Sequence, residues 1–109
     1  MARRTMTDGT GWFDDTHAVK FTEATRWNGN NHISRATGSQ WDHQALYYTR
    51  SGNWVLNGWS QWQGSLETYT KVDETEAIQW LIDNEHDDTD ELPESVRERI
   101  DEGIEAAEL

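Results

Sequence analysis

The fold of this chain is decided between residues 45 and 56, where the sequence reads ALYYTRSGNWVL. Two runs of aromatic and aliphatic residues flank the triplet Ser51-Gly52-Asn53, and these three residue types favour tight turns. Aromatic and β-branched residues are enriched in strands, so the segment predicts an antiparallel hairpin. We therefore take a sheet built around this hairpin as the starting point for the rest of the chain.

Further strands are predicted on both sides of the hairpin. Residues 18–27 alternate between apolar and polar positions, as a half-buried strand does, which places Phe21 and Trp27 on the same face. Asn28-Gly29 then gives a strong turn signal, because both residues tolerate positive φ. Altogether the sequence predicts four or five antiparallel strands joined by short turns. The predicted strands cover residues 18–27, 32–37, 41–50, 54–62 and 66–72.

The hydrophobic period changes at Asp73 from that of a strand to that of a helix. Residues 73–76 have the form of a capping box, in which the Asp73 side chain accepts from the backbone N–H of Glu76. Apolar residues then follow at helical spacing, with Trp80 at the margin of their face and the helix end near Glu85. A second helix follows Pro93, a residue tolerated in a first turn. Its narrow apolar stripe consists of Leu92, Val96, Ile100 and Ile104.

Strands followed by helices favour an α+β fold over a parallel sheet. We predict a four- to five-stranded antiparallel meander sheet followed by two C-terminal helices packed on or beside it. The 109 residues fit one domain at residues 17–109, with the sheet in 17–72 and an acidic helical segment in 73–109. Residues 1–16 lack periodicity, and we expect a flexible N-terminal arm there. The expected core consists of Val19, Phe21, Leu46, Leu56, Ile78, Leu81 and Ile82.

The charge is unevenly distributed along the chain, whose 21 acidic and 9 basic residues give a net charge of −12. Fifteen of the acidic residues follow Val72, where Arg97 and Arg99 are the only bases. Three interpretations remain open. The acidity could be a halophilic adaptation to a salt-rich cytosol, an ordinary solvated helix surface, or a surface that mimics nucleic acid or docks on a basic partner.

Motifs for catalysis and for metal or cofactor binding are not found in the sequence. The chain has no cysteine, and none of its histidines has a helical i, i+4 partner. Asp42 and His43 are neighbours on a predicted strand and should point to opposite faces, whereas His32 and His43 could meet if their strands paired. Residues 83–94 resemble a calcium loop in composition but lack its central glycine. We expect no enzyme, no cofactor and no dedicated metal site.

Tryptophan is abundant, with seven residues, of which six precede the predicted helices. One sheet face cannot bury all six. Residues 57–64, NGWSQWQG, place two tryptophans among amides, hydroxyls and glycines and carry no charge. Such a surface suits contact with an apolar anchor of a partner protein, with a sugar or with stacked bases. Alternatively, Trp59 and Trp62 lie on opposite faces of a twisted strand, one in the core and one capping it. The candidate binding residues are Trp41, Arg50, Trp59, Gln61, Trp62 and Gln63.

We therefore expect a small non-enzymatic binding or regulatory protein, which contacts another protein or itself through a Trp-rich sheet face and the acidic helical segment. One alternative is a ligand-binding module with an aromatic platform for a neutral polar ligand such as a glycan. Another is an acidic inhibitor that mimics nucleic acid. Direct nucleic-acid binding is disfavoured, because each phosphate contact needs a cation and the chain is strongly acidic. No apolar run follows the N-terminal arginines, so we expect no signal peptide, no membrane span and a cytoplasmic location.

Overall fold

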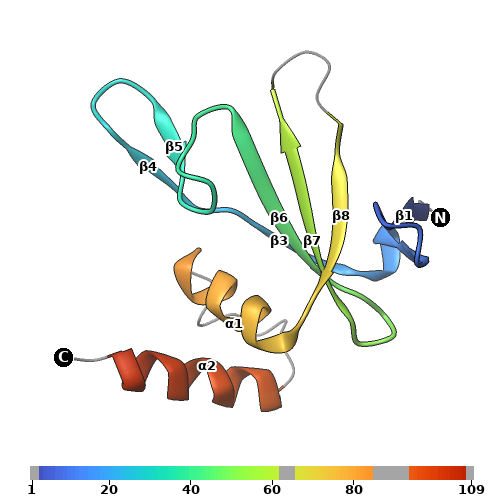
Figure 1. Cartoon of the computed structure of the whole chain (residues 1–109). Coiled ribbons are helices and arrows are strands. Elements are labelled where there is room, and N and C mark those ends of the chain that lie inside the picture. The colour runs from blue at the N-terminus through green and yellow to red at the C-terminus, as the bar shows by residue number, and fades with distance from the viewer. Residues whose placement is uncertain (1–2, 62–65, 85–93, 108–109) are drawn as a thin grey trace.

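The computed structural model describes residues 3–61, 66–84 and 94–107 of the chain. Within these residues the architecture is α+β, with antiparallel sheets followed by two helices, which confirms the predicted fold class (Figure 1). The strands are β1 (Arg3–Thr5), β2 (Trp12–Asp14), β3 (Val19–Thr22), β4 (Thr25–Trp27), β5 (His32–Ser34), β6 (Asp42–Tyr48), β7 (Trp54–Ser60) and β8 (Thr68–Val72). The helices are α1 (Glu74–Asp83) and α2 (Glu94–Ala107).

The central sheet has the strand order β3-β6-β7-β8, and all its neighbours are antiparallel. The predicted hairpin forms its middle, with Leu46 opposite Leu56 across β6 and β7. The turn between them has Gly52 at a φ of +88°, a conformation that glycine adopts without strain. Because side chains alternate along a strand, Leu46 and Leu56 face the helices while Tyr47 and Val55 face the other way.

The strand predicted over residues 18–27 is interrupted, which corrects the sequence interpretation. β3 ends at Thr22, and β4 pairs with β5 in a separate two-stranded sheet. At the break the N–H of Ala24 donates to Oδ1 of Asn84 at 3.0 Å, while the carbonyl of Ala24 accepts from the N–H of Arg35 at 2.8 Å. Trp27, expected on the same face as Phe21, is consequently 61% exposed.

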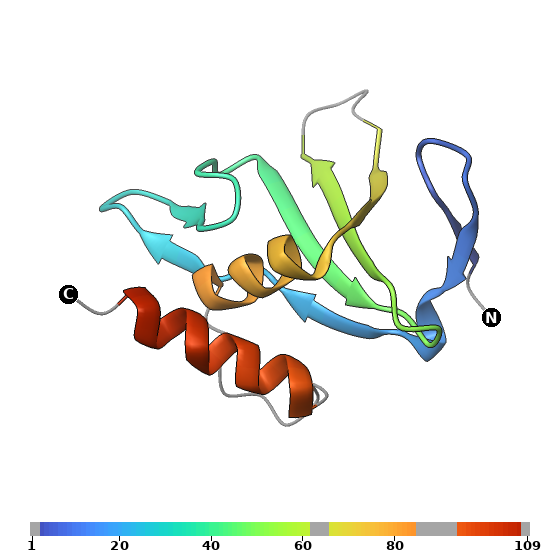
Figure 2. The same cartoon turned by 60° about the horizontal axis from the view of Figure 1, so that its bottom comes forward.

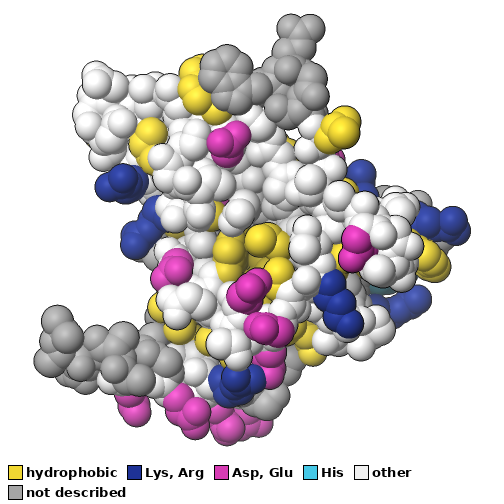
Figure 3. Space-filling view, in the orientation of Figure 1, with side chains coloured by type: hydrophobic (Ala, Val, Ile, Leu, Met, Phe, Trp, Pro, Cys, Tyr) yellow, Lys and Arg dark blue, Asp and Glu magenta, His cyan; other side chains and the backbone are white. Residues whose placement is uncertain are grey.

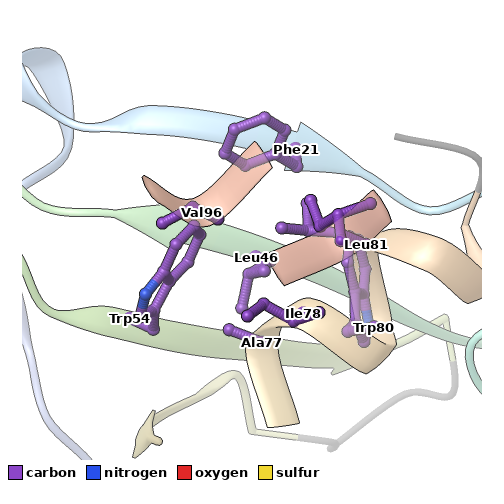
Figure 4. Close-up of a cluster of buried hydrophobic side chains, with 9 residues drawn as sticks. Phe21, Leu46, Trp54, Ala77, Ile78, Trp80, Leu81 and Val96 are labelled. Carbon is purple, nitrogen blue, oxygen red and sulfur yellow. The ribbon is translucent and has the colours of Figure 1, made fainter. Parts of the chain in front are cut away.

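Both helices lie on one side of the central sheet, where α1 and α2 pack against each other (Figure 2). Asp73 caps α1 as predicted, with Oδ1 accepting from the N–H of Glu76 at 2.8 Å. Val96 and Ile100 of α2 complete the cluster of buried side chains (Figure 4). Of the expected core, Phe21, Leu46, Ile78 and Leu81 are buried, whereas Val19, Leu56 and Ile82 are partly buried against them.

Trp80 is more deeply buried than its expected place at the margin of the helix face. Its indole Nε1–H donates to Oε1 of Gln44 on β6 at 3.1 Å. The ring can therefore enter the core without leaving its polar atom unsatisfied, which is the usual condition for burying tryptophan.

The N-terminal residues form a hairpin of β1 and β2 that the sequence did not indicate. Met6 and Phe13 are buried in a second cluster, on the face of the sheet that the helices leave free. The ring centroids of Phe13 and Tyr47 lie 5.1 Å apart. Thr7 also joins the hairpin to β8, because its N–H donates to the carbonyl of Tyr69 at 2.9 Å. The flexibility of residues 1–16 remains a prediction.

Candidate interaction surface

The end of the sheet where β6 begins and β7 ends brings two candidate residues together. Trp41 precedes β6 and Gln61 follows β7, and the N–H of Gln61 donates to the carbonyl of Trp41 at 2.9 Å. Trp41 is 41% exposed. Leu66, just before β8, is 86% exposed and lines a surface hollow at the same end. Two large apolar side chains therefore reach solvent at this end of the sheet.

The backbone that presents Trp41 is held by hydroxyl side chains. Oγ of Ser39 accepts from the N–H of Trp41 at 3.0 Å and from that of Asp42 at 3.3 Å. The hydroxyl of Thr37 donates to the carbonyl of Asp42 at 2.7 Å. These local bonds satisfy backbone groups at the start of β6, as serine and threonine do in turns. They fix the position from which the indole projects.

The hollow beside Leu66 has a volume of about 430 Å³ and a mostly small, polar lining. Gly58 matters here, because a Cβ at this position would lie 3.1 Å from Oγ1 of Thr68. That hydroxyl donates to the carbonyl of Gly58 at 3.4 Å, so a larger residue would displace it. The hollow offers hydroxyl, amide and backbone groups next to apolar surface. The residues that line it are Thr37, Asp42, His43, Gln44, Gly58, Trp59, Ser60, Leu66 and Thr68.

The ring of Trp59 lies on the sheet face opposite the helices and is partly buried. It lies 5.7 Å from the ring of His43, with 31° between the planes. The Nζ atom of Lys20 lies 6.0 Å from its centroid, within the range of a cation–π contact. Trp59 is thus neither part of the core beneath the helices nor a fully exposed platform. Whether Trp62 lies on the other face is a question outside the described residues.

Beneath Trp59, Glu23 and His43 form a polar pair. Oε2 of Glu23 lies 3.0 Å from Nδ1 of His43, and Oε1 accepts from the N–H of Gln44 at 2.6 Å. The other ring nitrogen of His43, Nε2, is buried and has no hydrogen-bond partner in the part of the chain that the structure describes. The pair thus links the residue that follows β3 to the beginning of β6. The sequence contained one signal for it, since Glu23 interrupts the apolar side of the alternation.

Two side chains near Trp59 have shifted pKa values. Burial of the hydroxyl raises the pKa of Tyr69 to about 12. The negative charge of Glu67 and a hydrogen bond to that carboxylate act in the same direction. Nε of Arg4 donates to Asp15 at 2.7 Å, and this bond raises the pKa of the guanidinium. Arg4 and Tyr69 line a hollow of about 230 Å³ together with Lys20, Tyr47 and Glu67. Both signs of charge occur there, next to aromatic rings.

The structure does not bring all candidate residues together. Trp41, Trp59 and Gln61 lie at one end of the β6–β7 hairpin, whereas Arg50 lies in the turn at the other end and is exposed. Trp62 and Gln63 fall outside the described residues. His32 and His43 do not meet, because His32 pairs with Trp27 in the small hairpin.

The two helices carry many of the acidic side chains among the described residues. Figure 3 shows Asp and Glu side chains gathered at the lower edge of the molecule, where α2 lies. The guanidinium of Arg99 on α2 forms an ion pair with Glu74 on α1. Arg99, one of the two bases after Val72, thus links the two helices through this ion pair. The other acidic side chains on the helices make this surface negative.

Across residues 3–61, 66–84 and 94–107, no group of three or more histidine, aspartate or glutamate side chains is arranged to hold a metal ion. The calcium-loop-like run at 83–94 falls almost entirely outside these ranges. In the same part of the chain, no helix has the length and apolar character needed to cross a bilayer. Comparisons with protein-family models, curated proteins and solved structures give no match.

Two surface features were missed by sequence reasoning. One is a cavity of about 450 Å³ between the N-terminal hairpin and the β6–β7 turn, where Trp12 is 53% exposed. The other is a groove between α1 and strands β7 and β8. Strand alternation places Leu56 and Val72 on the helix side, but nothing in the sequence says which strands a ten-residue helix will cover.

Proposed function

We propose that this chain is a non-enzymatic protein-binding module, whose anchor is the end of the sheet formed by Trp41, Trp59, Gln61 and Leu66. The observation that carries the proposal is the 41% exposure of Trp41 on a backbone fixed by side-chain hydrogen bonds. Tryptophan is enriched among residues that dominate binding energy at interfaces, and a fixed backbone lowers the entropy cost of binding.

The surroundings of Trp41 support a protein partner. Leu66 adds a second apolar side chain, and the hollow that it lines offers backbone and hydroxyl groups that suit a polypeptide. An apolar centre with a polar rim is the usual anatomy of a protein interface. The acidic surface of the helices would add electrostatic steering toward a partner with basic residues.

Partner capture with two matched variants tests this proposal. Trp41→Ala and Trp12→Ala each remove one partly exposed indole, but only Trp41 lies at the proposed anchor. Affinity capture from the source cytosol at its own salt concentration should recover a protein with the wild type and Trp12→Ala that is lost with Trp41→Ala. Sedimentation velocity of the same three proteins tests self-association. Identical recoveries and identical sedimentation for all three would contradict the proposal.

A second candidate function, binding of a neutral polar ligand such as a glycan, is favoured by the cavity at Trp12. The ring stands beside hydroxyl, amide and charged groups, including Thr10, Asn53 and Lys71. Hydrogen bonds from Thr10 lower the pKa of Asp8, which also lines the cavity. An aromatic wall next to fixed polar groups is a common arrangement in ligand sites.

Nuclear magnetic resonance titration with a panel of neutral oligosaccharides tests this second candidate. The indole N–H signal of Trp12 should shift in a saturable way, and Trp12→Ala should abolish binding. Trp27→Ala removes another exposed indole outside this cavity and should bind normally. Absence of any saturable shift at Trp12 would remove the candidate.

A further inference from the structure

The helices cover only part of the sheet face on which they pack. The core cluster joins α1 to Phe21, Leu46 and Trp54, whereas Leu56 on β7 and Val72 on β8 remain partly buried. A groove of about 230 Å³ runs between α1 and these two strands. Figure 3 shows hydrophobic side chains at the surface near the centre of this face, with acidic side chains beside them.

The lining of this groove is divided between an apolar floor and an acidic rim. The floor consists of Leu46, Leu56, Val72 and Trp80. On the rim, α1 contributes Glu76, Gln79 and Asp83, so both charged residues that line the groove are carboxylates. Nε2 of Gln79 donates to Oδ1 of Asp83 at 2.9 Å, which holds that carboxylate at the edge of the groove.

We propose that the groove binds a basic amphipathic segment of the partner protein. An apolar side chain of the segment would enter between Leu56 and Trp80, and flanking lysines or arginines would face Glu76 and Asp83. The inference rests on the proposed protein-binding function and adds the chemistry of the partner. Apolar anchors with complementary flanking charge are how amphipathic helices are recognised in grooves. A second copy of this chain fits poorly, because its net charge of −12 would oppose the acidic rim.

Two synthetic helical peptides provide the probe. Both carry leucines at the same positions of one face, and the flanking positions are lysine in one peptide and glutamate in the other. The lysine peptide should shift the indole N–H signal of Trp80 and the methyl signals of Leu56 and Val72 in a saturable way. The glutamate peptide should leave these signals unchanged.

Matched charge variants test the acidic rim. The double variant Glu76→Gln, Asp83→Asn should weaken binding of the lysine peptide about tenfold, because two charged contacts are lost. The control Glu98→Gln, Glu102→Gln removes the same charge from exposed positions on α2 and should leave the affinity within about twofold. Melting temperatures of both variants establish that they are folded.

Several outcomes would overturn the inference. These are equal affinity for the two peptides, no response at Trp80, and equal effects of the two charge variants. Concentration-dependent shifts of the same signals without peptide would assign the groove to a second copy of the chain. If the lysine peptide does not bind while partner capture still depends on Trp41, the groove proposal is wrong but the proposed function stands. If the lysine peptide binds while Trp41→Ala still captures the same partner, the proposed Trp41 anchor is wrong but the groove proposal stands.

Discussion

Glu23 and His43 are joined by a 3.0 Å contact between Oε2 and Nδ1, at the place where β3 leaves the central sheet. The same carboxylate accepts from the N–H of Gln44, so one side chain terminates the strand pairing of β3 with β6. We expect Glu23→Ala to lower the free energy of unfolding by about 1–3 kcal/mol, because it leaves the partly buried N–H of Gln44 without its acceptor.

Chemical denaturation of Glu23→Ala, with Asp42→Ala as the matched control, measures this cost. Asp42 is a neighbouring exposed carboxylate, and its removal should change the free energy of unfolding by no more than about 0.5 kcal/mol. Equal losses in the two variants would show that the Glu23 pair has no special role at this strand end.

Leu81 connects the helices to the sheet and is fully buried. Leu81→Ala should cost about 2–5 kcal/mol of unfolding free energy, because it removes buried methyl groups and leaves a cavity. Leu66→Ala makes the same chemical change at an exposed position and should cost less than about 0.5 kcal/mol. Similar denaturation midpoints for the two variants would contradict the packing of α1.

The acidic helical segment predicts a dependence of stability on salt. If the acidity is a halophilic adaptation, the melting temperature should rise steadily from dilute buffer into molar salt, because screening weakens repulsion among the carboxylates. The double variant Glu98→Gln, Glu102→Gln should show a smaller rise. A melting temperature that stays flat or falls would remove the halophilic interpretation and favour a partner-facing role for these charges.

Tyr69 predicts a loss of stability at alkaline pH. Its pKa is raised from 10.0 to about 12, so the uncharged hydroxyl contributes stability that is complete below pH 10.0 and is lost as the pH rises toward 12. An ultraviolet titration should show a tyrosine that ionises near pH 12. This signal should disappear in Tyr69→Phe and move to lower pH in Glu67→Gln. A Tyr69 signal that titrates near pH 10.0 in the folded protein would contradict the assignment.

The parts of the fold that the sequence predicted well are those set by local interactions. The hairpin around Gly52 and the start of α1 at Asp73 depend on turn chemistry and capping within a few residues. The contacts at the break between β3 and β4 include the bond between Ala24 and Asn84, which are 60 positions apart. A local alternation pattern contains no information about such a contact.

The candidate surface, too, was only partly predictable from the sequence. The abundance of tryptophan indicated that some rings would be exposed, and Trp41 is one of them. The predicted turn at Ser51-Gly52-Asn53 already implies that Arg50 and Gln61 lie at opposite ends of the hairpin, a consequence that composition alone does not reveal. The groove below Trp80 was also missed, since it depends on where α1 packs across the sheet.

The central claim, that Trp41 anchors a protein partner, is tested most directly by isothermal titration of the captured partner into wild type, Trp41→Ala and Trp12→Ala. We predict that Trp41→Ala loses about 2 kcal/mol or more of binding free energy, as a tryptophan anchor does, while its melting temperature stays close to that of the wild type. Trp12→Ala should bind like the wild type. Unchanged affinity in Trp41→Ala, or a loss explained by unfolding of that variant, would contradict the claim.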